Sequence, residues 1–182
     1  MKPEEEQLVA GCRNHNQKAC KRLYDMFAPS MMAVCMRYMG NRAEAQDVMQ
    51  DGFIKVFNNI GKLRTSAVLS AWIRRIMVNT AIDTIRKKAD LVSVEAVEDG
   101  KNLGVAADAF DNIGVEAIME ALAVLPDTQR VIFNLCEIEG YSDAEVAATL
   151  GMKEPSIRSA RCRARQALQK ILAKNIERFV AA

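Results

Sequence analysis

The stretch from residue 140 to 172 constrains the fold more than any other part of the chain. It reads GYSDAEVAATLGMKEPSIRSARCRARQALQKIL. Ser142 and Glu145 have the S-x-x-E spacing of a capping box, which satisfies free N–H groups at a helix N-terminus. Gly151 suits a turn with positive φ after that short helix, and Pro155 is tolerated in the first turn of the next one. Two helices joined by a glycine turn predict a helix-turn-helix motif.

The second helix of this motif is rich in arginine, at positions 158, 161, 163 and 165. Arginine forks match guanine edges and phosphate oxygens, so such a helix suits the major groove of DNA. Ala147 is small where the two helices cross, and Ile157 is an apolar anchor on the second helix. A helical hairpin with a solvated basic face would explain the same pattern without DNA.

The composition favours an all-α protein. Half of the 182 residues are apolar, glycine and proline are few, and the length allows one or two domains. No apolar run approaches the roughly 20 residues of a membrane span, and the N-terminus lacks the apolar region of a signal peptide. We therefore expect a cytoplasmic protein without membrane insertion.

Neither a metal centre nor an enzyme active site is indicated. The five cysteines are scattered and odd in number, which indicates reduced thiols. Cys12, His15 and Cys20 could hold a metal ion, but one C-x-x-H pair with a further cysteine is a weak pattern. His15 is the only histidine and has no nucleophile–base set around it. We expect no metal, no cofactor and no catalysis.

Charge is distributed unevenly along the chain. Residues 1–90 carry a net charge of +6, residues 91–117 of −5 and residues 118–182 of +1. From residue 91 to 114 the hydrophobic periodicity disappears among Asp, Gly and Asn. The sequence predicts two helical domains, residues 1–90 and 115–177, joined by a flexible acidic linker at 91–114 that DNA would repel.

Hydrophobic periodicity and capping residues divide the two domains into helices. We expect helices at residues 4–11, 16–27, 30–40, 42–60 and 71–88, with Ser70 as a cap, and further helices at 115–125 and 126–140. The residues expected in the core include Met26, Phe27, Met49, Phe53, Val56, Ile60, Ile118, Leu122, Leu135 and Ile138.

Two of these helices carry a second stripe that does not belong to the core. In the helix at 42–60 the stripe is acidic and polar around Ile54. It is either an ordinary solvated face or a docking surface for a basic partner. In the helix at 71–88 the stripe contains Arg75, Asn79, Ile82 and Arg86 beside Trp72. The tryptophan is either a core residue or a platform on which an unpaired base stacks while Asn79 binds its edge.

Taken together, the two blocks resemble a bacterial RNA polymerase sigma factor of the sigma-70 family, in the small extracytoplasmic-function (ECF) group. The segments that carry the resemblance are AEAQDVMQDGFIKVFNNI, SAWIRRIMVNTAIDTIRKK, LPDTQRVIFNLCEIEGYSDAEVAATLG and SIRSARCRARQAL. They cover roughly residues 5–175. The resemblance implies a subunit that binds core polymerase, recognises promoters, helps to melt them and has no catalysis of its own.

For the first domain the resemblance implies sigma region 2, with two sets of contact residues. Those expected on the coiled coil of the polymerase β′ clamp are Asp47, Gln50, Asp51, Ile54 and Phe57. Those expected on the −10 element, where a base of the non-template strand flips out, are Arg64, Ser66, Leu69, Trp72, Arg75, Asn79 and Arg86.

For the second domain the resemblance implies sigma region 4, which reads the −35 element as a duplex. The residues expected on that DNA are Ser156, Arg158, Ser159, Cys162, Arg163 and Arg165. The sequence departs from the family pattern at Asp143, where histidine is common, at the opening E-P-S of the recognition helix, and at Arg161, where an apolar residue is usual. The implied partners are the β′ clamp and β subunits of core polymerase, promoter DNA and an anti-sigma factor.

Two other readings remain open at this point. A free-standing helix-turn-helix regulator would bind DNA without polymerase, and a helical adaptor would bind no DNA. A metal-dependent enzyme would need ligands that the sequence does not clearly supply.

Overall fold

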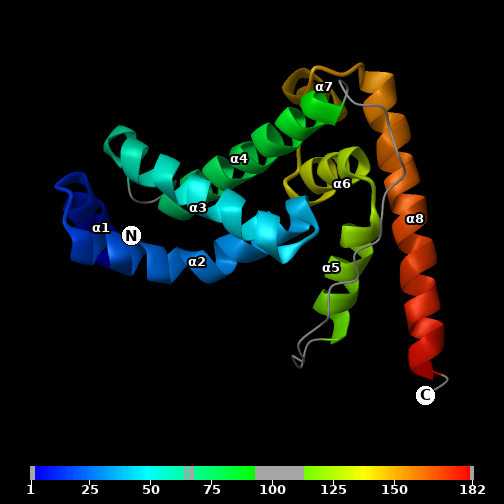
Figure 1. The fold of residues 1–182 in the computed structure, drawn as a ribbon, viewed down its shortest axis with the longest axis horizontal. Helices are drawn as coiled ribbons and strands as arrows, with labels where there is room; N and C mark the ends of the chain where they lie inside the picture. Colours follow the sequence, from blue (N-terminus) through cyan, green and yellow to red (C-terminus); the bar gives the residue numbers. More distant parts are fainter. Residues whose placement is uncertain (1–2, 64, 66–67, 93–112, 181–182) are drawn as a thin grey trace. The chain divides into compact units, whose positions relative to one another are not determined.

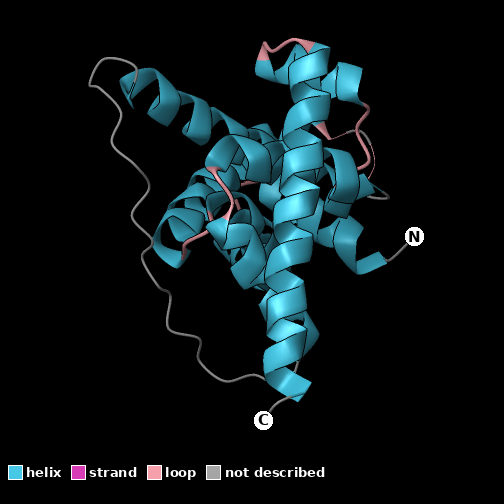
Figure 2. Cartoon of the chain, turned by 90° about the vertical axis from the view of Figure 1, so that its right-hand side faces the viewer, coloured by secondary structure: helices cyan, strands magenta, loops and turns pink. Residues whose placement is uncertain are grey.

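The computed structural model describes residues 3–63, 65, 68–92 and 113–180. In these residues the regular secondary structure is helical and no strand occurs, which confirms the all-α prediction (Figure 2). Contacts between Cα atoms divide the chain into a first unit, residues 1–36 with 42–94, and a second unit, residues 37–41 with 95–182. The expected linker falls mostly on residues 93–112, which lie outside the described residues.

The first unit is organised around a pair of neighbouring helices. Its elements are α1 (Pro3–Arg13), α2 (Gln17–Met39), α3 (Arg42–Asn59), the 3-10 turn η1 (Ile60–Lys62) and α4 (Leu69–Val92) (Figure 1). The last residues of α2, 37–39, are counted with the second unit. Helices α3 and α4 lie side by side. Gly52 permits this close approach, because a Cβ there would lie 2.2 Å from Met77 Sδ. The buried stripe expected on α3, Met49, Phe53, Val56 and Ile60, is confirmed.

The prediction of separate helices at 16–27 and 30–40 is wrong, because α2 is continuous through Pro29. Proline in a helix interior removes one N–H donor and costs about 3 kcal/mol. Here one apolar stripe continues on both sides of the proline and is buried at Leu23, Phe27, Met31, Val34 and Cys35. Ser30 also donates a hydrogen bond to the Phe27 carbonyl (2.9 Å) within the same turn. Burial of the whole stripe therefore outweighs the local defect.

Three further expectations in the first unit are corrected. Helix α4 begins at Leu69, so Ser70 lies inside the helix rather than at its cap. Ile82, expected beside Arg75 and Asn79, is buried at 4% exposure and belongs to the core face of α4. Met26 is 40% exposed, since it lies one residue step, about 100° around the helix, from the buried Phe27.

The second unit contains α5 (Ile113–Val124), α6 (Asp127–Phe133), the π-helical turn η3 (Asn134–Ile138), α7 (Asp143–Leu150) and α8 (Glu154–Val180). The helix-turn-helix prediction is confirmed in its details. Glu145 donates its backbone N–H to Ser142 Oγ (3.3 Å), and Glu145 Oε2 accepts from the Ser142 backbone N–H (2.9 Å). Gly151 ends α7 with φ of +66°. Ala147 and Ile157 are buried where α7 meets α8.

A small apolar cluster joins α5 to α8, built from Ala121, Leu122, Leu125, Ala164 and Leu168. Ile118, expected in the core, is 48% exposed because it lies one turn before this cluster. Ile138, also expected in the core, is 36% exposed. It ends the π-helical turn, whose wider turn rotates it off the face that holds Leu135.

Candidate nucleic-acid interface

One side of α8 anchors the helix and the other side faces solvent. The buried side is formed by Ile157, Ala160, Ala164 and Leu168, which recur every three or four residues. The exposed side contains all six residues expected on DNA, namely Ser156, Arg158, Ser159, Cys162, Arg163 and Arg165. The helix-turn-helix therefore holds α8 rigidly by its apolar face and presents a basic, hydroxyl-bearing face to solvent.

Several arginines of α8 are already engaged by carboxylates of the same unit. Glu137 Oε2 accepts a hydrogen bond from Arg165 Nη2 (2.7 Å), and Glu137 Oε1 accepts from Arg161 Nε. Arg161 Nη1 donates to Asp143 Oδ1 (2.9 Å). Arg158 lies 3.6 Å from Asp143 Oδ2 and 2.7 Å from Glu154 Oε1. Three acidic and three basic residues thus alternate in one network, which we call the arginine network.

Arg163 differs from these three arginines. It donates to the neutral Ser159 Oγ at 2.7 Å. Within the described residues no carboxylate lies in an ion pair with it, whereas Arg158 and Arg161 each have two such partners and Arg165 has one. Of these four arginines, Arg163 is therefore the one whose charge is most available to a phosphate or a guanine edge.

The carboxylates of the arginine network are held in the charged form. The hydrogen bond from Arg165 lowers the pKa of Glu137 despite an opposing contribution from burial. The hydrogen bond from Arg161 likewise lowers the pKa of Asp143. Both arginine contacts favour the carboxylate over the acid.

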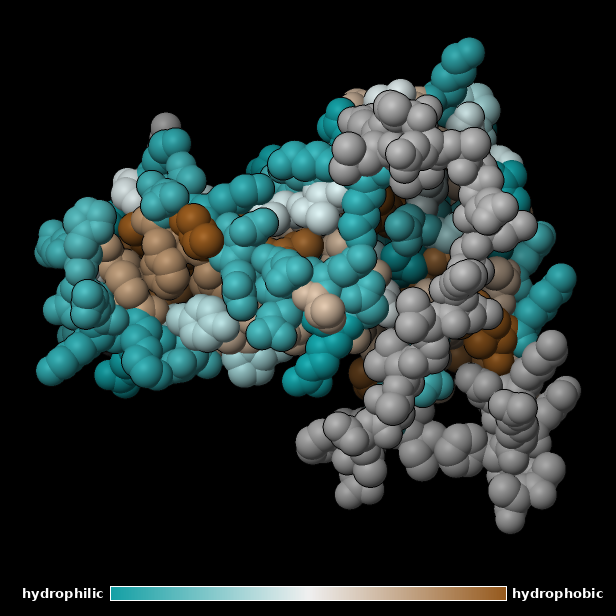
Figure 3. Space-filling model, in the orientation of Figure 1, coloured by the Kyte–Doolittle hydropathy of each residue, from teal (hydrophilic) through white to brown (hydrophobic). Residues whose placement is uncertain are grey.

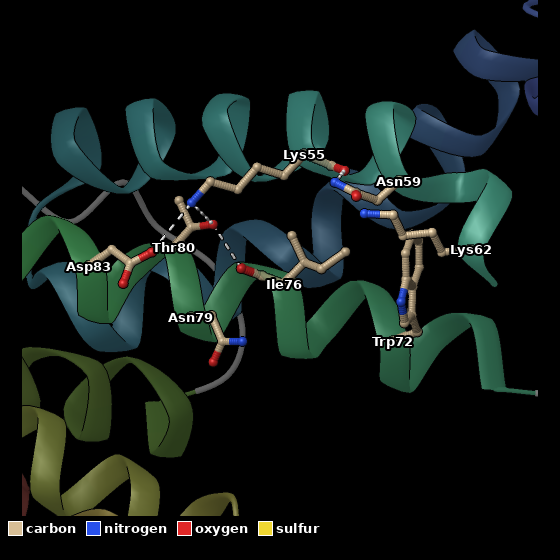
Figure 4. A pocket seen from close by; sticks show the side chains of 8 residues that line it. All are labelled: Lys55, Asn59, Lys62, Trp72, Ile76, Asn79, Thr80 and Asp83. Carbon is tan, nitrogen blue, oxygen red and sulfur yellow. Dashed lines mark hydrogen bonds and ion pairs between the residues drawn. The ribbon is translucent and has the colours of Figure 1, made fainter. Parts of the chain in front are cut away.

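In the first unit, a pocket of about 360 Å³ opens between α3 and α4 (Figure 4). It is lined by Lys55, Asn59, Lys62, Trp72, Ile76, Asn79, Thr80 and Asp83. Lys55 Nζ donates to Thr80 Oγ1 (3.1 Å) and lies 3.5 Å from Asp83 Oδ2. The packing of α3 against α4 therefore brings Lys55 to Asp83.

Trp72 is half-buried, so it is neither a fully enclosed core residue nor a free platform. It lines the pocket together with Lys62 and Asn79, and Asn79 extends from the outer side of α4 in Figure 4. Arg75, Asn79 and Arg86 are all exposed. An aromatic ring, an amide and cations therefore occur together along one side of α4, a combination that suits an unpaired base and its phosphates.

Leu69, also expected on the −10 element, is not brought to this surface. Leu69 is fully buried at 0% exposure, because it is the first residue of α4 and its side chain packs into the core of the first unit. That position departs from the prediction. Arg64 and Ser66 lie outside the described residues.

The residues expected on polymerase share one face of α3. Asp47, Gln50 and Asp51 are exposed, and Ile54 at 58% is among the most exposed large apolar side chains described. Phe57 is half-buried and stacks on the buried Phe53, with ring centroids 6.1 Å apart. Figure 3 shows apolar side chains surrounded by hydrophilic ones on the first unit. An exposed isoleucine ringed by carboxylates and an amide has the character of an interface rather than of a solvated face.

Two groups of residues were missed by sequence reasoning. The pocket residues Lys55, Asn59 and Thr80 come from different helices, so only the packing of α3 against α4 brings them together. Glu137 was assigned to an ordinary helix, and its contacts depend on the π-helical turn. For the pocket, the one sequence signal was the i, i+4 spacing of Lys55 and Asn59, which places both side chains on one side of α3.

The described residues contain no cluster of three His, Cys, Asp or Glu side chains arranged for a metal ion. Within the same residues, no helix is both long and apolar enough to cross a bilayer.

Comparison with known proteins agrees with this arrangement. The family model of sigma-70 region 2 matches residues 23–90, and that of sigma-70 region 4 matches residues 115–168. The chain is 31% identical over 155 residues to the ECF RNA polymerase sigma factor SigE of Mycolicibacterium smegmatis, covering 81% of this chain and 59% of that one. It is 28% identical over 172 residues to SigW of Bacillus subtilis, covering 86% and 90% of the two chains. The chain thus spans about three fifths of the first relative and most of the second.

Two solved structures have a similar fold. One is the sigma factor RpoE of Bartonella quintana in complex with the anti-sigma factor NepR, with a TM-score of 0.57, 23% identity and coverage of 84% of this chain and 96% of that one. The other is CnrH in complex with the cytosolic domain of CnrY, with a TM-score of 0.50, 21% identity and coverage of 94% and 98%.

A two-unit helical protein with a helix-turn-helix and a basic recognition helix belongs to the DNA-binding transcription factors. The matches to both sigma regions, in the same order as in the family, make the assignment narrower. The chain belongs to the sigma-70 family of RNA polymerase sigma factors and to its ECF group. Proteins of this family act in transcription initiation and are not enzymes.

Proposed function

We propose that this chain carries RNA polymerase to promoters by binding the −35 element with its second unit and the −10 element with its first. The observation that carries the proposal is the exposed face of α8, which is anchored from behind by Ile157, Ala160 and Ala164. A helix held in this way can enter a major groove without losing its own packing.

The −35 contacts are assigned to Ser156, Arg158, Ser159, Cys162 and Arg163. Arg165, also expected on this DNA, is paired with Glu137. Arg163 is the strongest candidate for a guanine or phosphate contact, because its recorded partner is a hydroxyl group. Arg158 can reach DNA while it is paired with Glu154, since its side chain remains 66% exposed.

The −10 contacts are assigned to Trp72, Arg75, Asn79 and Arg86, all on α4. Flipping a base from the duplex costs a few kcal/mol, which stacking and edge contacts in a pocket offset. Trp72 and Asn79 border a pocket of suitable character, and the exposed arginines can hold the phosphates of an opened strand.

The polymerase contact is assigned to α3, through Asp47, Gln50, Asp51, Ile54 and Phe57, on the β′ clamp. The exposed Ile54 supplies an apolar anchor, and the surrounding carboxylates supply electrostatic complementarity to a basic partner. An anti-sigma factor is a further proposed partner, by analogy with the RpoE–NepR and CnrH–CnrY complexes. The site of action that follows is the cytoplasm.

The decisive experiment is transcription with purified components. Core polymerase plus this chain should initiate at specific promoters, whereas a free-standing repressor or an adaptor would not support initiation. The variant Arg158→Ala with Arg163→Ala should lose −35 recognition, with promoter affinity reduced at least tenfold. The matched control is Lys21→Ala with Arg22→Ala, which removes two exposed cations from α2. Unchanged promoter binding by the first variant would disprove the −35 assignment.

A further inference from the structure

The arginine network supports a second conclusion, which rests on the proposed contact between α8 and DNA. Glu137 accepts hydrogen bonds from two different arginines of α8, one on each of its carboxylate oxygens. It comes from the π-helical turn η3, not from the helix-turn-helix itself. A residue outside the DNA-reading motif therefore controls two of its cations.

We propose that Glu137 limits the sequence-independent affinity of the recognition helix, because it withholds the charge of Arg165 from DNA phosphates. Arg165 Nη2 lies 2.7 Å from Glu137 Oε2, although the Arg165 side chain remains 53% exposed to solvent. Without Glu137 this guanidinium would be a free cation on the DNA-facing side of α8. A free cation adds affinity for any sequence, because phosphate contacts carry no sequence information.

The geometry at Arg161 explains why Glu137 stays in place. Arg161 donates from Nε to Glu137 Oε1 and from Nη1 to Asp143 Oδ1, so it bridges η3 and α7. The side chains of Glu137 and Asp143 are only 21% and 17% exposed, and that of Arg161 is 30% exposed. Partly buried, doubly hydrogen-bonded groups hold one orientation, so the second oxygen of Glu137 remains directed at Arg165.

The π-helical turn is the structural cause of this arrangement. The Glu139 backbone N–H donates to the Asn134 carbonyl (2.9 Å), five residues earlier, in place of the usual four. This wider turn rotates the residues near its end relative to an α-helix. Ile138 is exposed as a result, and the side chain of Glu137 is directed toward α8.

The test is Glu137→Gln in the full chain, with binding measured on a −35 duplex and on a scrambled duplex at several salt concentrations. The variant should bind scrambled DNA about fivefold more tightly, and the slope of log affinity against log salt should steepen by about one phosphate contact. The −35 duplex should gain affinity by a similar factor, because a phosphate contact favours every sequence alike. Glu145→Gln is the matched control, because it removes one charge from the same unit while glutamine preserves the capping box.

The pathway through Arg165 has its own test. In an Arg165→Ala background, Glu137→Gln should change DNA binding no more than Glu145→Gln does. The proposal is overturned if Glu137→Gln leaves the salt slope and the affinity for scrambled DNA unchanged, or if its effect persists without Arg165. If Glu137→Gln lowers the helical content, Arg165→Gln is tested in its place. This variant should leave the slope of log affinity against log salt unchanged, because Glu137 already withholds Arg165 from phosphates. Failure of the wild-type chain to prefer the −35 duplex would instead refute the proposed function.

Discussion

Asp143 and Arg161 form an ion pair, with 2.9 Å between Asp143 Oδ1 and Arg161 Nη1. Both residues stand where the sequence departs from the pattern of the family that it resembles. The two departures are linked in the structure: an arginine on this side of α8 needs a carboxylate on α7, because a half-buried cation without a partner is costly. The pair changes how α8 is attached and leaves the fold of the helix-turn-helix intact.

The first prediction concerns the strength of this pair. In a double-mutant cycle with Asp143→Ala and Arg161→Ala, the two residues should couple by about 1–2 kcal/mol, since both are partly buried and hydrogen-bonded. Urea unfolding followed by helical circular dichroism measures the coupling. The exposed pair of Lys21 and Asp25 is the control and should couple by no more than about 0.5 kcal/mol. Additive effects of the two alanine substitutions would show that the contact contributes nothing.

The second prediction is a loss of stability in acid. The pKa values of Glu137 and Asp143 are lowered in the folded state by hydrogen bonds from Arg165 and Arg161. Groups of this kind stabilise the fold above their unfolded pKa values, near about 4, and the contribution disappears as pH falls through the lower folded values. The free energy of unfolding should therefore decrease below about pH 4. Glu137→Gln with Asp143→Asn should make this decrease shallower, and an identical profile would argue against the network.

The third prediction separates strand capture from duplex binding. Asn79→Ala removes an exposed amide beside the pocket that Trp72 lines, and it should reduce open-complex formation about tenfold with little effect on duplex binding. Permanganate footprinting and a gel-shift assay report the two steps. Gln46→Ala, at an exposed amide of α3, is the control. Equal losses in both assays would show that Asn79 does not bind the captured base.

The fourth prediction tests the polymerase-binding face. Asp51→Lys reverses an exposed charge on α3 next to Ile54 and should weaken association with core polymerase at least tenfold. Asp25→Lys, at an exposed acid of α2, should have a much smaller effect. Affinity is measured by titration of labelled chain with core polymerase. If both variants bind as tightly as the wild type, α3 does not form the interface.

The fifth prediction uses a natural probe on the recognition helix. Cys162 is exposed on α8, whereas burial raises the pKa of both Cys12 and Cys35 to about 12. Cys162 should therefore alkylate much faster than those two thiols at pH 8. A −35 duplex should slow its alkylation about tenfold while leaving the half-buried Cys20 of the first unit unaffected. Mass spectrometry of the modified peptides resolves each site, and an unprotected Cys162 would place this face of α8 away from DNA.

The comparison of sequence and structure shows which inferences depend on local chemistry. The capping box at Ser142, the turn at Gly151 and the anchor at Ile157 were all predicted, because each depends on residues within one or two turns. The continuity of α2 through Pro29 was not, because the local cost of proline is outweighed by a buried stripe that only packing reveals. Ile118 and Ile138 were misplaced since periodicity cannot tell where a neighbouring helix ends or where a turn becomes π-helical.

By itself, the sequence determined the helical class, the helix-turn-helix and its basic second helix, since periodicity, capping and charge are properties of neighbours along the chain. The tertiary structure alone decided which of those charges are free. Glu137 and Asp143 hold Arg165 and Arg161, and Lys55 reaches Asp83, because helices distant in sequence pack within hydrogen-bonding reach. Electrostatic interactions act over a few ångströms in space, and the linear order of residues does not encode those distances.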